Sequence, residues 1–371
     1  MKELIWIEVS REALKNNIRE FRRIIGPEKI LCPCVKSNAY GHGLVGAAQA
    51  FLEAGADWLS VNSLPEARIL RKAGVASPIY ILGYVPLDCL EEAVELDCRL
   101  VVYNRETVEK LGLIGKPVRI HLKAETGNNR QGLTKESLVE LTKYILQFSN
   151  IEIEGMATHF ANIEDTTDHS YAEKQLANFN DCVRAVEELG VKIKIRHCAN
   201  SAATILFPET RFEMVRPGIA SYGMWPSTET FLSYKGGELN LQPALTWKTR
   251  IAQIKKVPEG EFVGYGCTFR TTRETRLAIL PVGYYDGYDR CLSGGHVLIK
   301  GRRAPVRGRI CMNIIMVDVT DIPEARLEDQ AVLMGRDMEE NISAEQFAKW
   351  AGTINYEVTT RINDNILRIY V

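Results

Sequence analysis

Short apolar runs recur along the first 223 residues, and most are rich in β-branched or bulky aliphatic residues. A polar turn follows each run, and amphipathic segments of helical period lie between several of them, many ending at glycine. The runs span residues 30–35, 58–61, 78–83, 99–103, 118–125, 153–160, 194–200 and 214–223. Eight βα units predict an α/β fold with a (β/α)8 TIM-type barrel, because an open doubly wound sheet more often stops near about six strands.

The pattern changes after residue 235, where strand-like segments follow one another without helices between them. The strand-like segments span residues 243–257, 276–283, 296–301 and 311–320, and one convincing late helix spans 343–352. The opening LIWIEVS is also strand-like and precedes the first barrel helix. We therefore expect the barrel over residues 11–233 and a β-rich C-terminal domain over 234–371, which the N-terminal residues 1–10 join.

Composition and charge argue against several classes of function. The chain has 371 residues, 46% of them hydrophobic and 25% charged, and its net charge of −1 with no basic block argues against nucleic acid or an anionic membrane as partner. No apolar run approaches the roughly 20 residues of a membrane helix, and the N-terminal segment lacks the order of a signal peptide. Nine scattered cysteines without a CxxC pair are typical of reduced core residues. We expect a cytoplasmic protein without a metal site.

Candidate chemistry gathers where the predicted barrel strands end. Lys36 follows the first run, His159 ends the sixth, Ser201 follows the seventh, and Arg216 and Gly218 lie in the eighth. Active sites of such barrels lie at the C-terminal ends of the strands, and the loops after strands seven and eight commonly bind a phosphate. A lysine facing a phosphate site predicts pyridoxal phosphate held as a Schiff base, because a desolvated amine is a good nucleophile for an aldehyde.

Segments along almost the full chain carry a family resemblance. In order they are CVKSNAYGHG, KAETGNNRQG, ATHFANIED, HCANSAAT, MVRPGIASYG, VGYGCTF, LPVGYYDGYDR, RGRICMN and TINYEV. They resemble the motifs of alanine racemases, which are fold-type III pyridoxal-phosphate enzymes. One such segment alone is weak evidence, whereas this many in the family's order are strong evidence.

The resemblance implies racemisation of alanine by two bases on pyridoxal 5'-phosphate. Lys36 carries the cofactor and serves one face of a planar carbanion, and Tyr265 of the partner subunit serves the other. His159 and then Arg216 support the tyrosine, whose pKa must fall from about 10. Arg216 also donates to the pyridine nitrogen, which makes the cofactor a weaker electron sink. Taken alone, His159 is more often a structural histidine, and only the matched segment reverses that reading.

Five positions match those that bind the cofactor's phosphate in the family. They are Tyr40, Ser201, the backbone of Gly218 and Ile219, and Tyr356. Without the resemblance, a packing role for the two tyrosines is as well supported as phosphate binding.

The resemblance also implies how the substrate is bound. Its carboxylate is assigned to Arg130 with the backbone of Met312 from the partner subunit. Tyr284 matches the entrance tyrosine, and Lys123 matches a position that is carbamylated in some members. These assignments imply a homodimer with shared active sites. The resemblance also implies that the enzyme supplies D-alanine for peptidoglycan.

Four residues depart from the family's pattern. Asn313 and Glu125 stand where aspartate is common, and Asn128 and Asn129 stand where a small or apolar residue often occurs. These positions border the carboxylate-binding arginine and the entrance, so the departures put substrate breadth in question, with serine as an alternative substrate.

Two further readings come from other classes. A fold-type III amino-acid decarboxylase shares barrel, cofactor and β domain, but generally has a cysteine and an aspartate where this chain has Tyr265; Cys267 and Cys311 keep that alternative open. A non-catalytic pyridoxal-phosphate carrier has the barrel alone, and the β-rich domain argues against it.

Overall fold

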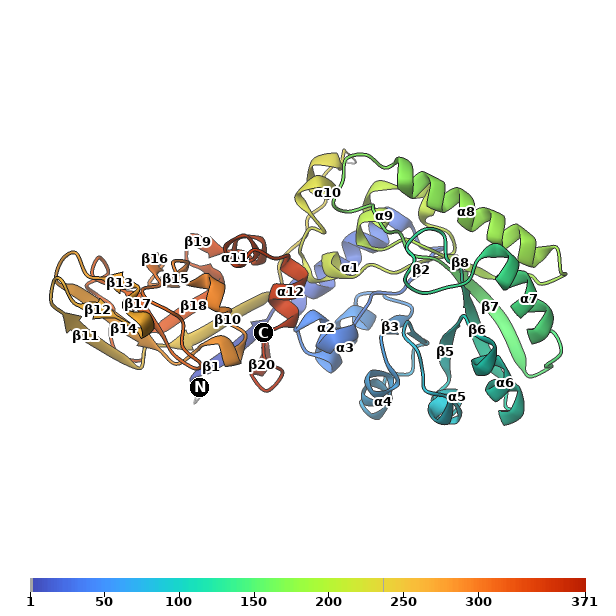
Figure 1. Ribbon diagram of the computed structural model, residues 1–371, viewed down its shortest axis with the longest axis horizontal. Helices are drawn as coiled ribbons and strands as arrows, with labels where there is room; N and C mark the ends of the chain where they lie inside the picture. The colour runs from blue at the N-terminus through green and yellow to red at the C-terminus, as the bar shows by residue number, and fades with distance from the viewer. Residues whose placement is uncertain (1–2, 236) are drawn as a thin grey trace. The chain divides into compact units, whose positions relative to one another are not determined.

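The computed structural model describes residues 3–235 and 237–371 (Figure 1). The chain divides into two compact units. One, here called the barrel unit, holds Glu12–Ala39 and Leu44–Gln242. The other, here called the β-rich unit, holds the N-terminal residues up to Arg11, the segment Tyr40–Gly43 and Pro243–Val371. None of the helices in the described ranges is long and apolar enough to cross a bilayer.

Eight parallel strands among the described residues form the centre of the barrel unit, one at each predicted run. They are β2 (Ile30–Leu31), β3 (Leu59–Val61), β4 (Ile79–Ile81), β5 (Cys98–Val102), β6 (Val118–Lys123), β7 (Ile151–Ala157), β8 (Ile195–His197) and β9 (Met214–Val215). Strands β3 to β8 form one sheet in chain order, and β2 pairs with β9.

Backbone hydrogen bonds join the two sheets into a ring. The amide of Val35 donates to the carbonyl of Ser60 over 2.8 Å and joins the end of β2 to β3. The amide of Arg216 donates to the carbonyl of Ala199 over 2.9 Å and joins the end of β9 to the segment after β8. Ring closure confirms the predicted α/β barrel, since a closed parallel sheet leaves no unpaired edge.

Helices follow the strands, and Figure 1 shows α4 to α8 on the outer side of β3 to β8. The helices of this part are α1 (Arg11–Ile25), α2 (Lys36–Tyr40), α3 (Leu44–Glu53), α4 (Leu64–Lys72), α5 (Leu90–Glu95), α6 (Arg105–Ile114), α7 (Lys135–Ile145), α8 (Ser170–Glu187), α9 (Ser201–Leu206) and α10 (Thr228–Ser233), with 3-10 turns η1 (Leu87–Cys89), η2 (Pro208–Thr210) and η3 (Ile219–Tyr222). Their ends follow local chemistry: the Asn104 side chain caps α6 by accepting from the amide of Thr107, and left-handed Gly115 ends it.

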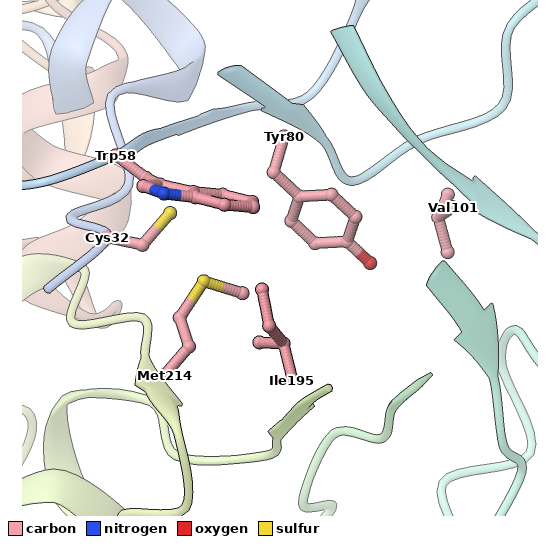
Figure 2. Close-up of a cluster of buried hydrophobic side chains, with 6 residues drawn as sticks. All are labelled: Cys32, Trp58, Tyr80, Val101, Ile195 and Met214. Atoms are coloured by element: carbon pink, nitrogen blue, oxygen red, sulfur yellow. The ribbon is translucent and has the colours of Figure 1, made fainter. Parts of the chain in front are cut away.

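A cluster of buried side chains lies inside the barrel (Figure 2). Its members come from or lie beside six different strands and are Cys32, Trp58, Tyr80, Val101, Ile195 and Met214. They are at most 8% exposed, so the barrel interior is a packed core. This core supports the polar side chains of the same strands.

The β-rich unit is built around a mixed sheet with the order β16-β15-β18-β10-β1-β20, from which β19 pairs with β18. Its strands are β1 (Ile5–Val9), β10 (Leu245–Arg250), β11 (Gln253–Val257), β12 (Phe262–Val263), β13 (Phe269–Arg270), β14 (Thr275–Leu280), β15 (His296–Ile299), β16 (Arg302–Pro305), β17 (Ile315–Asp318), β18 (Gln330–Asp337), β19 (Glu340–Ile342) and β20 (Leu367–Tyr370). A second sheet has the order β11-β14-β17. N-terminal β1 pairs antiparallel with β10 and parallel with β20.

Short helical elements complete the β-rich unit. They are η4 (Tyr265–Cys267), η5 (Tyr284–Asp286), η6 (Arg290–Leu292), α11 (Ala344–Ala351) and α12 (Asn355–Thr360). Helix α11 lies at the predicted late helix, capped by the Ser343 side chain and ended by left-handed Gly352. Helix α12 was not predicted, because its β-branched residues lower helix propensity. It is stabilised by packing, with Asn355, Val358 and Thr359 buried.

The segment Tyr40–Gly43 belongs to the β-rich unit, although it lies within the chain of the barrel. Arg368 Nε donates to the carbonyl of Gly41 over 3.1 Å, and the Tyr370 hydroxyl lies 2.8 Å from the carbonyl oxygen of His42 and 2.7 Å from that of Gly43. Gly41 has φ +85°, and a Cβ there would lie 2.0 Å from the carbonyl oxygen of Thr359. Glycine is therefore required by the close approach of two backbones.

We expect Gly41→Ala to lower the melting temperature substantially, because a methyl group overlaps the Thr359 carbonyl in addition to the left-handed strain. Gly26→Ala is the matched control, since Gly26 has φ +77° and nothing within 4 Å of a Cβ. Calorimetry of both variants measures the difference. Equal losses in the two variants would show that backbone strain alone decides the effect.

Candidate active site

The chain around Lys36 forms an unusual turn at the end of β2. Ser37, Asn38, Ala39 and Tyr40 have φ of 54°, 52°, 53° and 52°, which is one turn of left-handed helix. Each such residue costs about 1–2 kcal/mol unless it is glycine or asparagine. Strain of this kind persists only where surrounding structure enforces it, and it is concentrated at functional sites.

Side chains from neighbouring elements hold this turn. The carboxylate of Glu66 on α4 accepts from the amide of Ser37 over 2.6 Å and from the amide of Asn62 over 2.8 Å. Asn38 Oδ1 accepts from the amide of Leu44 over 2.8 Å. Before the turn, the buried Tyr222 hydroxyl donates to the carbonyl of Cys34 over 2.7 Å. Lys36, which is half-buried, therefore extends from a rigid backbone.

Arg216 lies at the end of β9 and is only 7% exposed. Its Nη2 donates to the carbonyl of Thr158 over 3.0 Å, and its Nη1 donates to Nδ1 of His197. A guanidinium is always a donor, so His197 accepts through a neutral ring. These two bonds orient the guanidinium plane.

Two groups near Arg216 have strongly lowered pKa values. Burial, followed by the charges of Lys123, Arg216, Arg130 and Lys36, lowers the pKa of His159 well below its usual range. Burial, followed by Arg216 and Arg130, likewise lowers the pKa of Lys123. His159 is therefore a neutral imidazole that can accept a hydrogen bond, and Lys123 has the character of a free amine.

Ser201 and Gly218 join the loops after β8 and β9. The Ser201 hydroxyl oxygen accepts from the amide of Gly218 over 2.8 Å and from that of Ala220 over 3.3 Å. Ser201 begins α9, and Ile219 begins η3 directly after Gly218. The first amides of a helical turn have no partner within it, so two such turn starts and a hydroxyl lie together here. This is the chemistry that binds a phosphate.

The loop after β6 presents Arg130. The Glu125 carboxylate accepts from the amides of Gly127 and Asn128, each over 2.6 Å, and from that of Arg130 over 3.2 Å. The side chain of Arg130 is exposed. Burial raises the pKa of Glu125, but the backbone hydrogen bonds, of which that of Asn129 is the largest, outweigh it and lower the pKa. Glu125 is thus the acceptor around which the loop folds.

Three predicted site residues are exposed on the β-rich unit. Tyr265, in η4, is 69% exposed, Met312 is 55% exposed, and Tyr284, in η5, is 42% exposed. A Cβ at Gly283 would lie 2.2 Å from the carbonyl oxygen of Cys311, so glycine lets the two loops touch.

The segment after β16, which holds Met312, contacts the loops of Tyr265 and Tyr284. Met316 Cε lies 2.7 Å from a Cβ placed at Gly264, and Arg309 Nη1 lies 2.8 Å from one at Gly266, so the loop of Tyr265 packs on this segment. The amide of Tyr284 donates to the carbonyl of Cys311 over 3.1 Å.

Tyr40 and Tyr356 lie together in the β-rich unit, with ring centroids 6.2 Å apart. Tyr40 is buried and Tyr356, on α12, is half-buried. Asn313, which departs from the family's aspartate, donates from Nδ2 to the Asp286 carboxylate over 3.3 Å. An asparagine can make this bond and an ionised aspartate cannot, so the substitution suits its neighbour.

The sequence did not predict the residues whose hydrogen bonds position the candidate site residues. Gln175, buried on α8, accepts from the amide of Ala161 over 2.8 Å and lies 3.4 Å from the carbonyl oxygen of His159. Glu66 holds the Lys36 turn, and His197 orients Arg216. The period-2 alternation of β8 signals an inward-facing His197, whereas nothing in the local sequence separates Gln175 or Glu66 from ordinary helix residues.

We expect the loop of Glu125 to loosen in acid. Because the folded pKa is depressed below the ordinary 4.5, the stabilisation is complete above that pH and is lost as the pH falls through the lower folded value. Amide hydrogen exchange of Gly127 and Asn128 measures it. In Glu125→Gln these amides should exchange fast at neutral pH as well, and slow exchange in that variant would contradict the role of the carboxylate.

Comparisons with known proteins agree with this geometry. Residues 9–226 match the model of the alanine racemase N-terminal domain, and residues 244–370 match that of the C-terminal domain. An alanine racemase of Desulforamulus reducens is 43% identical over 100% of both chains, and one of Methanococcus maripaludis is 44% identical over 99% of this chain and 98% of that one. The crystal structure of an alanine racemase from Bacillus anthracis with bound L-Ala-P is 36% identical, with a TM-score of 0.95 over 100% of this chain and 96% of that one. The predicted resemblance is therefore confirmed, and the chain belongs to the alanine racemase family.

Proposed function

We propose that this protein interconverts L-alanine and D-alanine with pyridoxal 5'-phosphate as cofactor. The observation that carries the proposal is the barrel unit's set of side chains: an amine on a rigid turn, a neutral histidine and an oriented guanidinium, in a chain of the alanine racemase family. Racemisation moves one proton off a carbon and returns it to the opposite face. It needs no oxidant and no metal.

The residues of the barrel unit suit the cofactor. Lys36 would hold its aldehyde carbon, Ser201 with the backbone of Gly218 and Ile219 would hold its phosphate, and Arg216 would face its ring nitrogen. The Ser201 hydroxyl proton and the first amides of two helical turns are uncharged donors that a phosphate can accept. The amide of Gly218, which donates to the Ser201 oxygen, would donate to the phosphate in its place. We assign Tyr40 and Tyr356 of the β-rich unit as further phosphate contacts. The bound group supplies an electron sink that acidifies the Cα proton of the substrate.

Two bases on opposite faces complete the reaction. Lys36 removes or returns the Cα proton on one face, and Tyr265 of the partner subunit acts on the other. A neutral His159 can accept a hydrogen bond from a tyrosine hydroxyl, whereas a protonated one would compete as a donor. The cations that keep His159 neutral also stabilise a phenolate, which a tyrosine needs in order to act as a base.

Substrate binding is assigned to Arg130, with the backbone of Met312 from the partner subunit, and entry to Tyr284. Lys123 is a candidate for carbamylation. Its nitrogen would bond to the carbon of carbon dioxide and release one proton, leaving a carbamate anion that the charges of Arg130 and Arg216 would stabilise. The lowered pKa of Lys123 favours this reaction, because only the free amine attacks carbon dioxide.

The sharing of Tyr265 and Met312 between subunits makes a homodimer part of the proposal. Their exposure on the β-rich unit, together with that of Tyr284, Tyr285 and Ile314, leaves an aromatic and aliphatic surface of the kind that interfaces cover. We further propose that the reaction takes place in the cytoplasm and supplies D-alanine for peptidoglycan.

We expect Lys36→Ala to abolish covalent attachment of pyridoxal phosphate. Borohydride reduction followed by peptide mass spectrometry locates the attachment in the parent protein, and Lys192→Ala, at an exposed lysine, is the control that should retain it. A labelled peptide other than that of Lys36 would make a different lysine the anchor.

We expect Tyr265→Phe to retain the cofactor and lose most racemisation, by about 1000-fold or more, because one face loses its base. Cα–H exchange in deuterium oxide should persist for one enantiomer only, since Lys36 still serves its face. Circular dichroism follows racemisation and NMR follows exchange, with Tyr84→Phe as the exposed control.

Undiminished racemisation in Tyr265→Phe would remove the two-base account. Parallel assays with L-serine and for release of carbon dioxide separate the broader racemase and the decarboxylase from the alanine racemase.

A further inference from the structure

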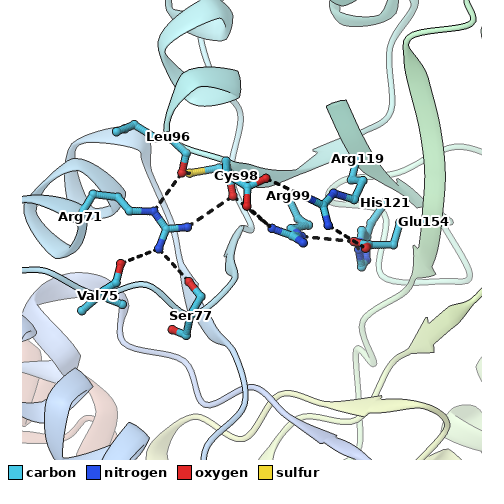
Figure 3. Close-up of polar contacts among 10 residues, drawn as sticks. Arg71, Val75, Ser77, Leu96, Cys98, Arg99, Arg119, His121 and Glu154 are labelled. Carbon is cyan, nitrogen blue, oxygen red and sulfur yellow. Dashed lines mark hydrogen bonds and ion pairs between the residues drawn. The ribbon is translucent and has the colours of Figure 1, made fainter. Parts of the chain in front are cut away.

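A chain of buried side chains leads from Arg216 away from the strand ends into the barrel. Arg216 Nη1 contacts His197 Nδ1 on β8, His197 Nε2 lies 2.7 Å from His121 Nδ1 on β6, and His121 Nε2 lies 3.2 Å from Glu154 Oε2 on β7. The two histidines are fully buried, and Glu154 is 8% exposed. Figure 3 shows the far end, with His121 and Glu154 beside Arg99 and Arg119.

The chemistry of the two ends sets the direction of every hydrogen bond in this chain. A guanidinium only donates, so His197 Nδ1 carries no proton and its Nε2 carries one. That proton is donated to His121 Nδ1, which leaves the His121 proton on Nε2. An ionised carboxylate only accepts, so Glu154 takes this last bond. A cation and an anion thus terminate a line of two neutral imidazoles.

The charge states agree with this direction. Burial, followed by Arg216, lowers the pKa of His197, and burial also lowers that of His121 despite the opposing effect of Glu154. Burial raises the pKa of Glu154, but the bond from His121 and then Arg99 and Arg119 outweigh it and lower the pKa.

The backbone is shaped to bring Glu154 to His121. The register between β6 and β7 shifts here, since Ile120 pairs with Ile153 whereas His121 pairs with Gly155. Glu154 is therefore the extra residue of a β-bulge, a feature that re-aims a side chain. A Cβ at Gly155 would lie 2.6 Å from His121 Nδ1, so glycine leaves room for the ring.

The aromatic ring of Tyr80 packs against both imidazoles. The Tyr80 ring lies 4.9 Å from that of His121 and 5.2 Å from that of His197. Tyr80 belongs to the packed core of Figure 2, and Arg99 stacks over Trp58 of the same core at 5.1 Å. The chain is thus fixed along its length as well as at its ends.

We propose that Glu154 is a positioning residue for the reaction: through His121 and His197 it fixes the orientation of the Arg216 guanidinium. This inference rests on the proposed function for the role of Arg216 toward the cofactor ring. Glu154 touches no reacting atom. A purely structural ion pair with Arg99 and Arg119 would stabilise the barrel without constraining Arg216.

The test is a double-mutant cycle on the holoenzyme with Glu154→Gln, His121→Phe and the double variant. We expect either single change to lower kcat about tenfold with KM for alanine nearly unchanged, because a misoriented group weakens the reaction more than binding. The double variant should be no worse than His121→Phe, since Glu154 acts only through His121. Glu152→Gln is the matched control on the same strand, where Glu152 is exposed and pairs with Lys194.

An NMR measurement independent of turnover accompanies the cycle. In the parent protein, ¹⁵N spectra should show His197 and His121 protonated on Nε2 alone and separate Nη signals from a locked Arg216. In Glu154→Gln the Nη signals should merge as the guanidinium rotates, while they stay separate in Glu152→Gln. In Glu154→Asp the Nη signals should stay partly separate, because a carboxylate is still present.

Three outcomes would overturn the proposal: a proton on Nδ1 of either histidine, a locked Arg216 in Glu154→Gln, or additive losses of kcat. A parent protein that does not racemise alanine would instead refute the proposed function. The NMR arm would still decide whether Glu154 orients Arg216.

Discussion

The structure depends on one electrostatic constraint: a guanidinium that cannot lose its charge lies almost out of water at the mouth of the barrel. An isolated buried charge is costly, so Arg216 must be hydrogen-bonded. The backbone carbonyl of Thr158 and the ring of His197 supply the bonds. Glu154 supplies a negative charge at the end of two neutral rings, without placing a carboxylate against the site itself.

Positive charge at the mouth also decides what the site can bind. Besides burial, the charges of Lys36, Arg130 and Arg216, and that of Lys123 in its protonated form, lower the pKa of His159. Such a field favours anions, which suits a phosphate, a substrate carboxylate and a carbamate on Lys123. The same field disfavours further protonation, so the histidine and Lys123 are pushed towards their neutral forms. One set of charges thereby tunes the groups proposed to bind anions and those proposed to exchange protons.

Rigid backbone features hold these charges in place. The left-handed turn after Lys36 is enforced by the Glu66 carboxylate and the Asn38 side chain, and the bulge at Glu154 depends on the missing side chain of Gly155. In the β-rich unit, Gly283 lets the Tyr284 loop touch the carbonyl of Cys311, which organises an exposed surface. Each device uses a close contact that a larger or differently shaped residue would prevent.

The sequence by itself determined the strand count and the strand order of the barrel, because alternation and turn residues are local and a closed parallel sheet orders its strands by connection. It also predicted the family and the candidate residues through motifs that lie in contiguous segments. Only the tertiary structure decided that Tyr40–Gly43 belongs to the β-rich unit, that Asn355–Thr360 is a helix, and that Gln175, Glu66 and the line from Glu154 to His197 support the site. These features join residues that are distant in sequence, and no local pattern distinguishes an ordinary buried histidine from one that orients a guanidinium.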